Sequence, residues 1–350
     1  MDGAEERGYP RVMSDKPDKV ADALPNSWVY KLLPQSVWPY AQLARWERPI
    51  GWWLLLWPCW WSIMLAAFSS RYRLEIEDPS LPMVGVFQFD QKFEIAAALL
   101  LMPLFLVGAM SMRGAGCTYN DIVDVDLDEQ VARTASRPIP SGRVSKRNAA
   151  LFLIAQALIG CAILFLLCSF MTPFNWFAFF LGVASLAIVA LYPFAKRITD
   201  WPQLVLGLAF SWGALIGWAV VFGTLSAPPL LLYAGSILWT IGYDTIYAHQ
   251  DREDDALVGV RSTARLFGEN TKPALIALYS GTLVLIGLAY WLVDLSWLAY
   301  FGLAIGCSHM IWQIATLNIN DADNCLKLFQ SNKHFGWIIF AGLWLELFFG

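Results

Sequence analysis

The chain has 350 residues, of which 57% are hydrophobic and only 15% are charged, with a mean hydropathy of +0.50. Soluble globular domains carry roughly 25% charged residues, so this composition excludes an ordinary soluble protein and indicates a chain built for lipid. The formal net charge of −4 says little by itself, because the positions of the charges carry the information.

The first 40 residues are expected to form a disordered tail on the cytosolic side. Before Leu24 this segment holds six acids and four bases, and it lacks the apolar core of a signal peptide. Its acids also argue against an organelle transit peptide, which is rich in Arg and poor in acids. The first apolar segment would then act as an uncleaved insertion signal.

Nine apolar segments follow, each close to the twenty residues that a helix needs to cross a bilayer. The predicted spans are residues 50–68, 94–119, 147–171, 174–192, 202–222, 227–247, 273–293, 295–316 and 334–349. The predicted fold class is therefore all-α, a polytopic membrane protein whose nine transmembrane helices form one bundle over residues 41–350. Tryptophans gather at span ends, as in GWWLLLWPCWWS, which is typical of interfacial belts.

The basic residues predict the orientation of the bundle, because Lys and Arg collect in cytoplasmic loops. With the N-terminus inside, the inner segments hold 20 of the 24 basic residues, and Arg113 falls within the second span. We therefore expect a cytoplasmic N-terminus, and nine spans would place the C-terminus on the opposite side.

Two acid-rich segments follow the second and sixth predicted spans. In the first, Asn120, Asp124 and Asp128 recur every four residues, which places them on one face of a helix. The second, YDTIYAHQDREDD, also has acids that share a face, at spacings of seven and four: Asp244, Asp251 and Asp255.

A fixed shift relates the two segments. Moving the first motif by 127 residues (247 − 120) places its three polar positions on Tyr247, Asp251 and Asp255. Because four spans separate the motifs, and four is even, both should end on the same side of the membrane. We therefore predict an internal duplication, with repeat one at about 45–195, repeat two at about 200–320 and a final helix at about 334–349.

Carboxylates stacked one turn apart repel one another unless a cation joins them. Hard oxygen ligands without His or Cys favour Mg²⁺, which binds through a few carboxylates together with the phosphates of a substrate. Two facing clusters therefore predict a pair of Mg²⁺ ions that hold a diphosphate between them. The predicted metal ligands are Asn120, Asp124, Asp128, Asp251 and Asp255. A solvated acidic loop is the alternative, and the register between the two clusters makes it the weaker one.

Basic residues near the first acids are candidates for holding the diphosphate. Arg133 and Arg137 lie one turn apart in RTASRP, where a pair of guanidinium groups could clamp phosphate oxygens. Lys196, in LYPFAKR, could reach the same site, although membrane topology alone explains it equally well.

These motifs resemble those of the UbiA superfamily of intramembrane aromatic prenyltransferases. The resemblance covers residues 40–350 and rests on NDIVDVDLD, RTASRPIPSG, YPFAKRITDWPQLVLGLAFSWG, DTIYAHQDREDD with the following GVRSTA, and FQSN. The third of these stretches points to the 4-hydroxybenzoate branch. The resemblance implies a central cavity open to lipid. It also implies transfer of a polyprenyl group from polyprenyl diphosphate to the 4-hydroxybenzoate carbon ortho to the hydroxyl, a step of ubiquinone biosynthesis that releases pyrophosphate.

The resemblance also implies roles for individual residues. Asp124 and Asp251 would be catalytic through the metal ions that they hold. Asp244, one turn deeper than Tyr247, would hydrogen-bond the phenol and could accept its proton, or it would orient the metal ligands. Tyr247 is expected to contact substrate.

The acceptor carboxylate should bind a guanidinium group. Arg48, or its neighbour Arg45, is the candidate at the start of the first span, with anchoring to lipid headgroups as an equal alternative. The expected partners are the two substrates and the lipid bilayer, with no nucleic acid and no obligate protein partner.

Three other functions are weighed against this one. A different aromatic acceptor, such as a chlorophyll-type ring or haem, would keep the family and the donor. A secondary transporter would also have acids and repeated halves, but these acids lie on one side and no broken helices are evident. A CDP-alcohol phosphotransferase would need an Asp-Gly…Ala-Arg…Gly pattern that the chain lacks. The expected location is a bacterial inner (plasma) membrane, because the tail is acidic, with the mitochondrial inner membrane as the alternative.

Overall fold

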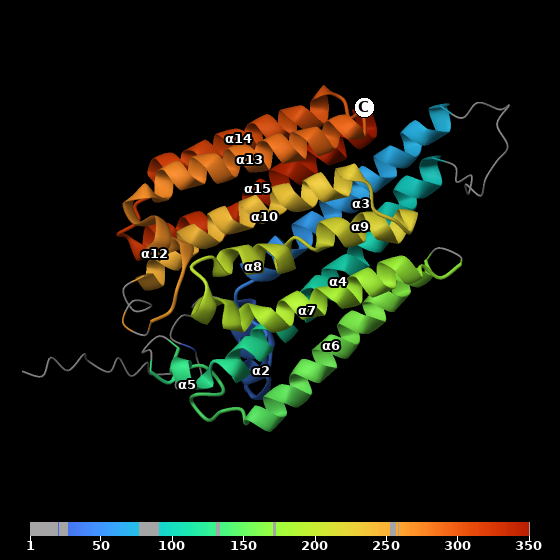
Figure 1. Cartoon of the computed structure of the whole chain (residues 1–350). Helices are drawn as coiled ribbons and strands as arrows, with labels where there is room; N and C mark the ends of the chain where they lie inside the picture. The colour runs from blue at the N-terminus through green and yellow to red at the C-terminus, as the bar shows by residue number, and fades with distance from the viewer. Residues whose placement is uncertain are drawn as a thin grey trace, which may run out of the picture.

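The computed structural model describes residues 20, 27–76, 91–130, 134–170, 173–252, 257 and 259–349, with side chains at 70–76 and 91–95 left out. Within these ranges the regular elements are all helices, as the sequence predicts. The long helices lie side by side in a single elongated bundle (Figure 1). The α-helices are α1 (Trp28–Leu32), α2 (Trp38–Leu43), α3 (Ile50–Ile76), α4 (Gln91–Val123), α5 (Val125–Asp128), α6 (Lys146–Ser169), α7 (Trp176–Ile198), α8 (Pro202–Phe210), α9 (Gly213–Phe222), α10 (Ala227–Ala248), α12 (Thr263–Phe267), α13 (Thr271–Leu292), α14 (Trp297–Thr316) and α15 (Ala322–Phe349).

Seven candidate membrane spans are found among the described residues, by length and composition. They correspond to α3, α4, α6, α7, the α8–α9 segment, the α12–α13 segment and α14, so the chain is a multi-pass membrane protein. The other two predicted spans, α10 and α15, have 22 and 28 residues but do not pass the same test of apolarity. Both bury polar side chains inside the bundle, such as Thr240 and Asn332, and this lowers their hydropathy.

The predicted repeats fall on comparable helix pairs. α4 packs along α6 in the first half, and α10 packs along α13 in the second. α10 lies at the centre of the bundle, where it also contacts α3, α8, α9 and α15. The internal duplication itself stays a prediction.

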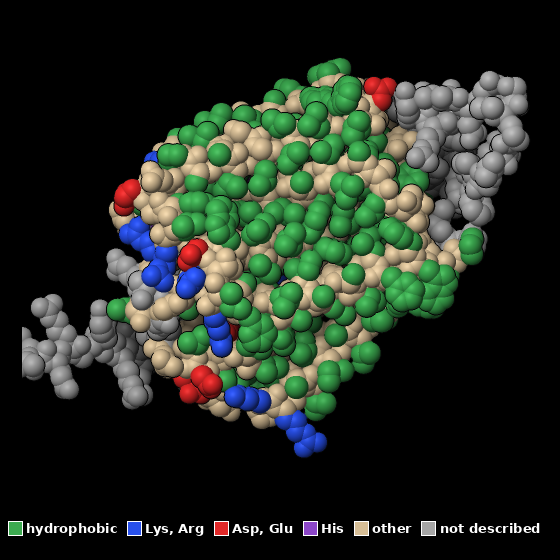
Figure 2. All heavy atoms as spheres, in the orientation of Figure 1, with side chains coloured by type: hydrophobic (Ala, Val, Ile, Leu, Met, Phe, Trp, Pro, Cys, Tyr) green, Lys and Arg blue, Asp and Glu red, His purple; other side chains and the backbone are tan. Residues whose placement is uncertain are grey.

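Both acid-rich segments lie at one end of the bundle. α2, α5 and α12 lie at that end, and the C-terminus lies at the other (Figure 1). On the face shown in Figure 2, Lys and Arg side chains gather at the same end as α5 and α12, while hydrophobic side chains predominate along the middle of the bundle. Such a distribution suits a bundle that crosses lipid and keeps one polar mouth.

Residues 202–222, predicted as a single span, form two helices that meet at Ser211 and Trp212. The second of them, α9, packs very closely against α3: a Cβ atom at Gly217 would lie 2.7 Å from the carbonyl oxygen of Cys59. The hydroxyl of Ser62 on α3 also donates to the carbonyl of Ala214. The expectation of unbroken helices is therefore wrong here, and close packing against α3 accompanies the break.

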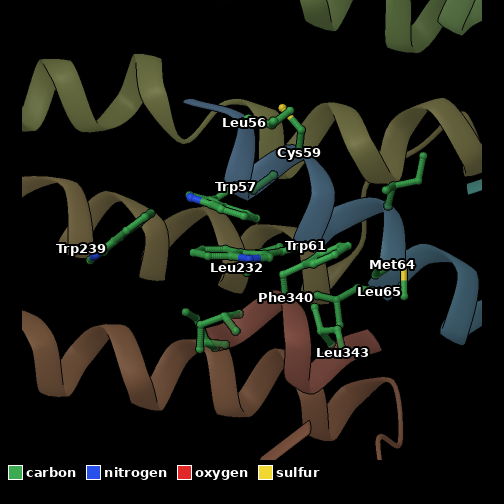
Figure 3. Close-up of a cluster of buried hydrophobic side chains, with 14 of the residues drawn as sticks. Leu56, Trp57, Cys59, Trp61, Met64, Leu65, Leu232, Trp239, Phe340 and Leu343 are labelled. Carbon is green, nitrogen blue, oxygen red and sulfur yellow. The ribbon is translucent and has the colours of Figure 1, made fainter. Parts of the chain in front are cut away.

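The tryptophan-rich stretch of α3 also differs from its prediction as an interfacial belt. Trp57 and Trp61 are fully buried, and Figure 3 shows them among the core side chains that join α3 to α10 and α15. The Trp61 ring lies 5.3 Å from that of Trp239, and its Nε1 donates to the carbonyl of Gly336 at 3.3 Å. Each buried indole removes a large apolar area from lipid or water and fills the core. Trp297, in contrast, is exposed at the end of α14.

Candidate active site

A cavity of about 230 Å³ lies at the charged end of the bundle. Its walls come from both acid-rich segments, from α7 and α8, and from the loop that precedes α12. Seven of the residues predicted from the sequence line it: Asn120, Asp128, Arg137, Lys196, Asp244, Tyr247 and Asp251. Two segments that are more than a hundred residues apart in the chain therefore contribute to one site. Arg133 and Asp255, also predicted, lie outside the described residues.

The first acid motif keeps its helical register across the junction of α4 and α5. The backbone N–H of Asp124 donates to the carbonyl of Asn120, and that of Asp128 donates to the carbonyl of Asp124, each at 2.9 Å. Asn120 and Asp128 line the cavity, whereas Asp124 is 1% exposed and does not.

Basic side chains neutralise the acids of this motif. Asp124 forms ion pairs with Lys196 and with Arg197, whose Nη2 lies 3.0 Å from Oδ1. Asp128 accepts from Nη1 of Arg137 at 3.0 and 2.8 Å. Burial raises the pKa of Asp128, and the guanidinium of Arg137 opposes that rise. The residues predicted to bind metal and those predicted to bind diphosphate are therefore paired with one another.

The second motif continues from α10 into the short helix η2 (His249–Asp251). Gln203 on α8 lines the cavity together with Asp244. The side-chain oxygen of Gln203 accepts from the backbone N–H of Thr263 at 3.0 Å. The Tyr247 ring packs against Phe329, with 4.5 Å between ring centroids. Asp244 thus shares the cavity wall with α8, and Tyr247 packs against α15.

The two arginines at the start of the first span do not line the cavity. Arg48 donates through Nε to Oε1 of the buried Glu47 at 3.1 Å. Arg45 pairs through Nη2 with Asp121 at 2.6 Å. The structure therefore does not bring Arg48 together with the other predicted substrate-binding residues.

Two functional candidates were missed by sequence reasoning. Arg113, inside α4, packs over the Phe210 ring at 5.0 Å and interacts electrostatically with Asp244. Its signal in the sequence is a charge within an apolar span, which is costly unless the charge faces the bundle interior. Arg261, in GVRSTA, lines the cavity and donates through its backbone N–H to the carbonyl of Lys196 at 3.0 Å. It links the loop before α12 to the end of α7.

A sequence profile of the UbiA prenyltransferase family matches residues 55–339. The chain belongs to this family. It is 44% identical over 306 residues to the mitochondrial 4-hydroxybenzoate polyprenyltransferase of Drosophila pseudoobscura pseudoobscura. This match covers 87% of this chain and 69% of the relative. The corresponding protein of Arabidopsis thaliana is 44% identical over 319 residues (91% and 70%), and that of Bos taurus is 43% identical over 312 residues (89% and 76%).

Solved structures of UbiA homologues share the fold. The apo structure of a homologue from Aeropyrum pernix K1 matches with a TM-score of 0.64 and 26% identity, over 84% of this chain and 98% of that one. A homologue from Archaeoglobus fulgidus bound to GPP and Mg²⁺ matches with a TM-score of 0.58 and 17% identity, over 88% and 99%.

The site of this UbiA family member fits Mg²⁺ by the chemistry of its donors. Among the residues that the structure describes, no three His, Cys, Asp or Glu side chains converge to form a metal site by themselves. The carboxylates of Asp124 and Asp128 are instead turned toward bases. Asn120, Asp128 and Asp251 nevertheless offer hard oxygen atoms to one cavity, and Mg²⁺ takes its remaining ligands from water and phosphate.

Proposed function

We propose that the chain transfers a polyprenyl group from polyprenyl diphosphate to the ring carbon of 4-hydroxybenzoate ortho to the hydroxyl, with release of pyrophosphate, in ubiquinone biosynthesis. The single observation that carries the proposal is the meeting of both acid motifs with Arg137 and Lys196 in one cavity. Relatives at 43–44% identity bear this activity in their names, which supports the choice of acceptor and donor.

The donor side of the cavity would bind the diphosphate. Asn120, Asp124, Asp128, Asp251 and Asp255 would hold two metal ions. A family homologue bound to GPP and Mg²⁺ supports the choice of metal. Bound Mg²⁺ would neutralise the diphosphate and stabilise the negative charge that grows on it as the allylic C–O bond breaks. Lys196 and Arg137 would then turn from the carboxylates to the phosphate oxygens, which Arg133 would also bind.

The acceptor side would lie around Asp244. This carboxylate would hydrogen-bond the phenol and accept its proton, and Gln203 would hold it in orientation. In place of Arg48 we propose Arg113 as the partner of the acceptor carboxylate. Neither arginine lines the cavity, but the charge of Arg113 acts on the cavity-lining Asp244. An ion pair with the substrate would compensate this intramembrane charge.

The proposal includes nine membrane spans, with α10 and α15 added to the seven that composition identifies. The polyprenyl tail would remain in the bilayer, because each CH₂ group gains about 0.8 kcal/mol in apolar surroundings, and the cavity would therefore open toward lipid. The sequence favours a bacterial plasma membrane, whereas the relatives are named as mitochondrial proteins. Fractionation of the source cell decides between these membranes.

Product analysis tests the proposal. Membranes that contain the protein are incubated with radiolabelled 4-hydroxybenzoate and prenyl diphosphates of graded length, with and without EDTA. We expect a labelled lipid-soluble product that EDTA abolishes and added Mg²⁺ restores. Prenylation of another aromatic compound alone would identify a different acceptor. No pyrophosphate release with any acceptor would overturn the proposed function.

A further inference from the structure

Asp121 is a buried carboxylate that the proposed chemistry does not use. It adjoins the cavity-lining Asn120 in α4, but its own side chain is fully buried and does not line the cavity. A buried carboxylate is costly unless it is paired. Its position inside the acid motif therefore calls for a role other than metal binding.

The partners of Asp121 are two arginines from distant segments. Its Oδ1 lies 2.6 Å from Nη2 of Arg45, which precedes the first span, and 3.3 Å from Nη1 of Arg137. The same Nη1 group of Arg137 contacts both oxygens of Asp128. Two acids and two arginines thus form a chain of ion pairs, Arg45–Asp121–Arg137–Asp128, without net charge.

The two arginines differ in what they can reach. Arg45 is fixed: its backbone has a positive φ of 57°, and its Nη1 donates to the carbonyl of Gln42. It does not line the cavity, whereas Arg137 does. Asp121 therefore joins a fixed guanidinium on one side to a guanidinium that faces the substrate site on the other.

We propose that Asp121 is a positioning residue that holds Arg137 at the diphosphate site when Asp128 turns to bind metal. The proposal rests on the proposed function, because it assigns Asp128 to the metal and Arg137 to the diphosphate. In the structure Arg137 has two carboxylate partners. Once Asp128 binds a cation, Asp121 remains as the anion that keeps the guanidinium in place and leaves its other N–H groups for phosphate oxygens.

Asp121→Asn tests this role with little change of shape. It removes the charge and retains an acceptor oxygen, and among the described residues the second oxygen, Oδ2, has no hydrogen-bond partner to lose. In detergent or nanodiscs we expect a KM for prenyl diphosphate about tenfold higher, while the KM for 4-hydroxybenzoate stays within about twofold. Binding of inorganic pyrophosphate in the presence of Mg²⁺, measured by calorimetry without any acceptor, should weaken by the same factor. The exposed Asp126 provides a control, and Asp126→Asn should match the wild type in both measurements.

Asp121 could position Arg137, or it could only compensate the buried charge of Arg45, and a double variant separates these two roles. Asp121→Asn alone leaves Arg45 buried without its carboxylate, so the variant could fail to fold, whereas Arg45→Gln with Asp121→Asn removes both charges. If Asp121 positions Arg137, the folded double variant keeps the tenfold defect, and Arg45→Gln alone binds pyrophosphate like the wild type. Wild-type pyrophosphate affinity in the double variant would overturn the proposal. Failure of the proposed function would look different, because the wild-type protein would then form no product.

Discussion

Replacing Lys196 with methionine removes the ammonium group that pairs with Asp124 and keeps the length and apolar stem of the side chain. In the structure this ammonium pairs with the carboxylate of Asp124, which we assign to Mg²⁺. A metal ion that binds alone must displace it. A metal ion that arrives with a diphosphate offers the ammonium a new partner. Lys196→Met should therefore strengthen binding of metal alone and weaken binding of diphosphate.

The expected size follows from the exposure of the two groups. The Asp124 side chain is 1% exposed and that of Lys196 is 26% exposed, so the contact is partly screened by water. Hydrogen bonds to charged groups contribute about 1.5–3 kcal/mol, and partial exposure favours the lower value. A change of about 1.4 kcal/mol is a factor of ten in a binding constant. We therefore expect metal affinity to rise about tenfold and pyrophosphate affinity to fall about tenfold.

Calorimetry with Mn²⁺ alone, and with pyrophosphate in the presence of Mg²⁺, measures both effects on the purified protein in nanodiscs. Lys146→Met, which removes an exposed lysine at the start of α6, is the matched control and should change neither constant. Mn²⁺ affinity that stays the same or falls in Lys196→Met would refute the exchange of partners. Unchanged pyrophosphate affinity would refute the assignment of Lys196 to the diphosphate.

Three further predictions concern the acceptor, pH and packing. Arg113→Gln should raise the KM for 4-hydroxybenzoate at least about tenfold without raising the KM for a phenol that lacks the carboxylate. Arg48→Gln should leave both KM values unchanged. A KM for 4-hydroxybenzoate raised in Arg48→Gln and unchanged in Arg113→Gln would restore Arg48 as the carboxylate partner. Burial, with Arg252 nearby, lowers the pKa of His249 to about 4, so the neutral ring is favoured in the folded state. Stability should fall as the pH drops from the ordinary His pKa of about 6.5 toward 4, by at most about 2 kcal/mol between pH 7 and 5. His249→Gln should flatten this dependence of the thermal midpoint, and equal pH slopes would contradict it. Gly217→Val should cost about 1–3 kcal/mol of stability by pushing α9 from α3, whereas Gly116→Ala, within α4 and facing open space, should not lower the melting temperature.

The sequence predicts the site well where function lies in local spacing. Asn120 and Asp128 lie on the same face, about two turns apart across the junction of α4 and α5. The fixed shift that relates this motif to Asp251 predicts that both segments lie at the same end, and both line the cavity. These inferences need only the helical period and the even number of spans between the two motifs. Asn120, Asp128 and Asp251, three of the side chains that spacing groups together, lie on the cavity wall, whereas Asp124 is buried behind it.

Pairings between distant segments cannot be read from spacing. Asp121 contacts Arg45, 76 residues earlier in the chain, and only the packing of α2 against α4 brings them together. Gln203 lines the cavity with Asp244, and its side-chain oxygen accepts from the backbone N–H of Thr263; nothing local in the sequence indicates either contact. The break between α8 and α9 is also hidden from local spacing, because it accompanies contacts between α9 and the distant α3.

The central claim is that both acid motifs form one metal-dependent diphosphate site, and metal binding by variants of each motif tests it most directly. Mn²⁺ binding is followed by electron paramagnetic resonance in the presence of an unreactive prenyl thiolodiphosphate. Asp124→Asn, from the first motif, and Asp251→Asn, from the second, should each abolish the bound Mn²⁺–diphosphate signal in protein that remains folded. A wild-type signal in either variant would show that its motif lies outside the site.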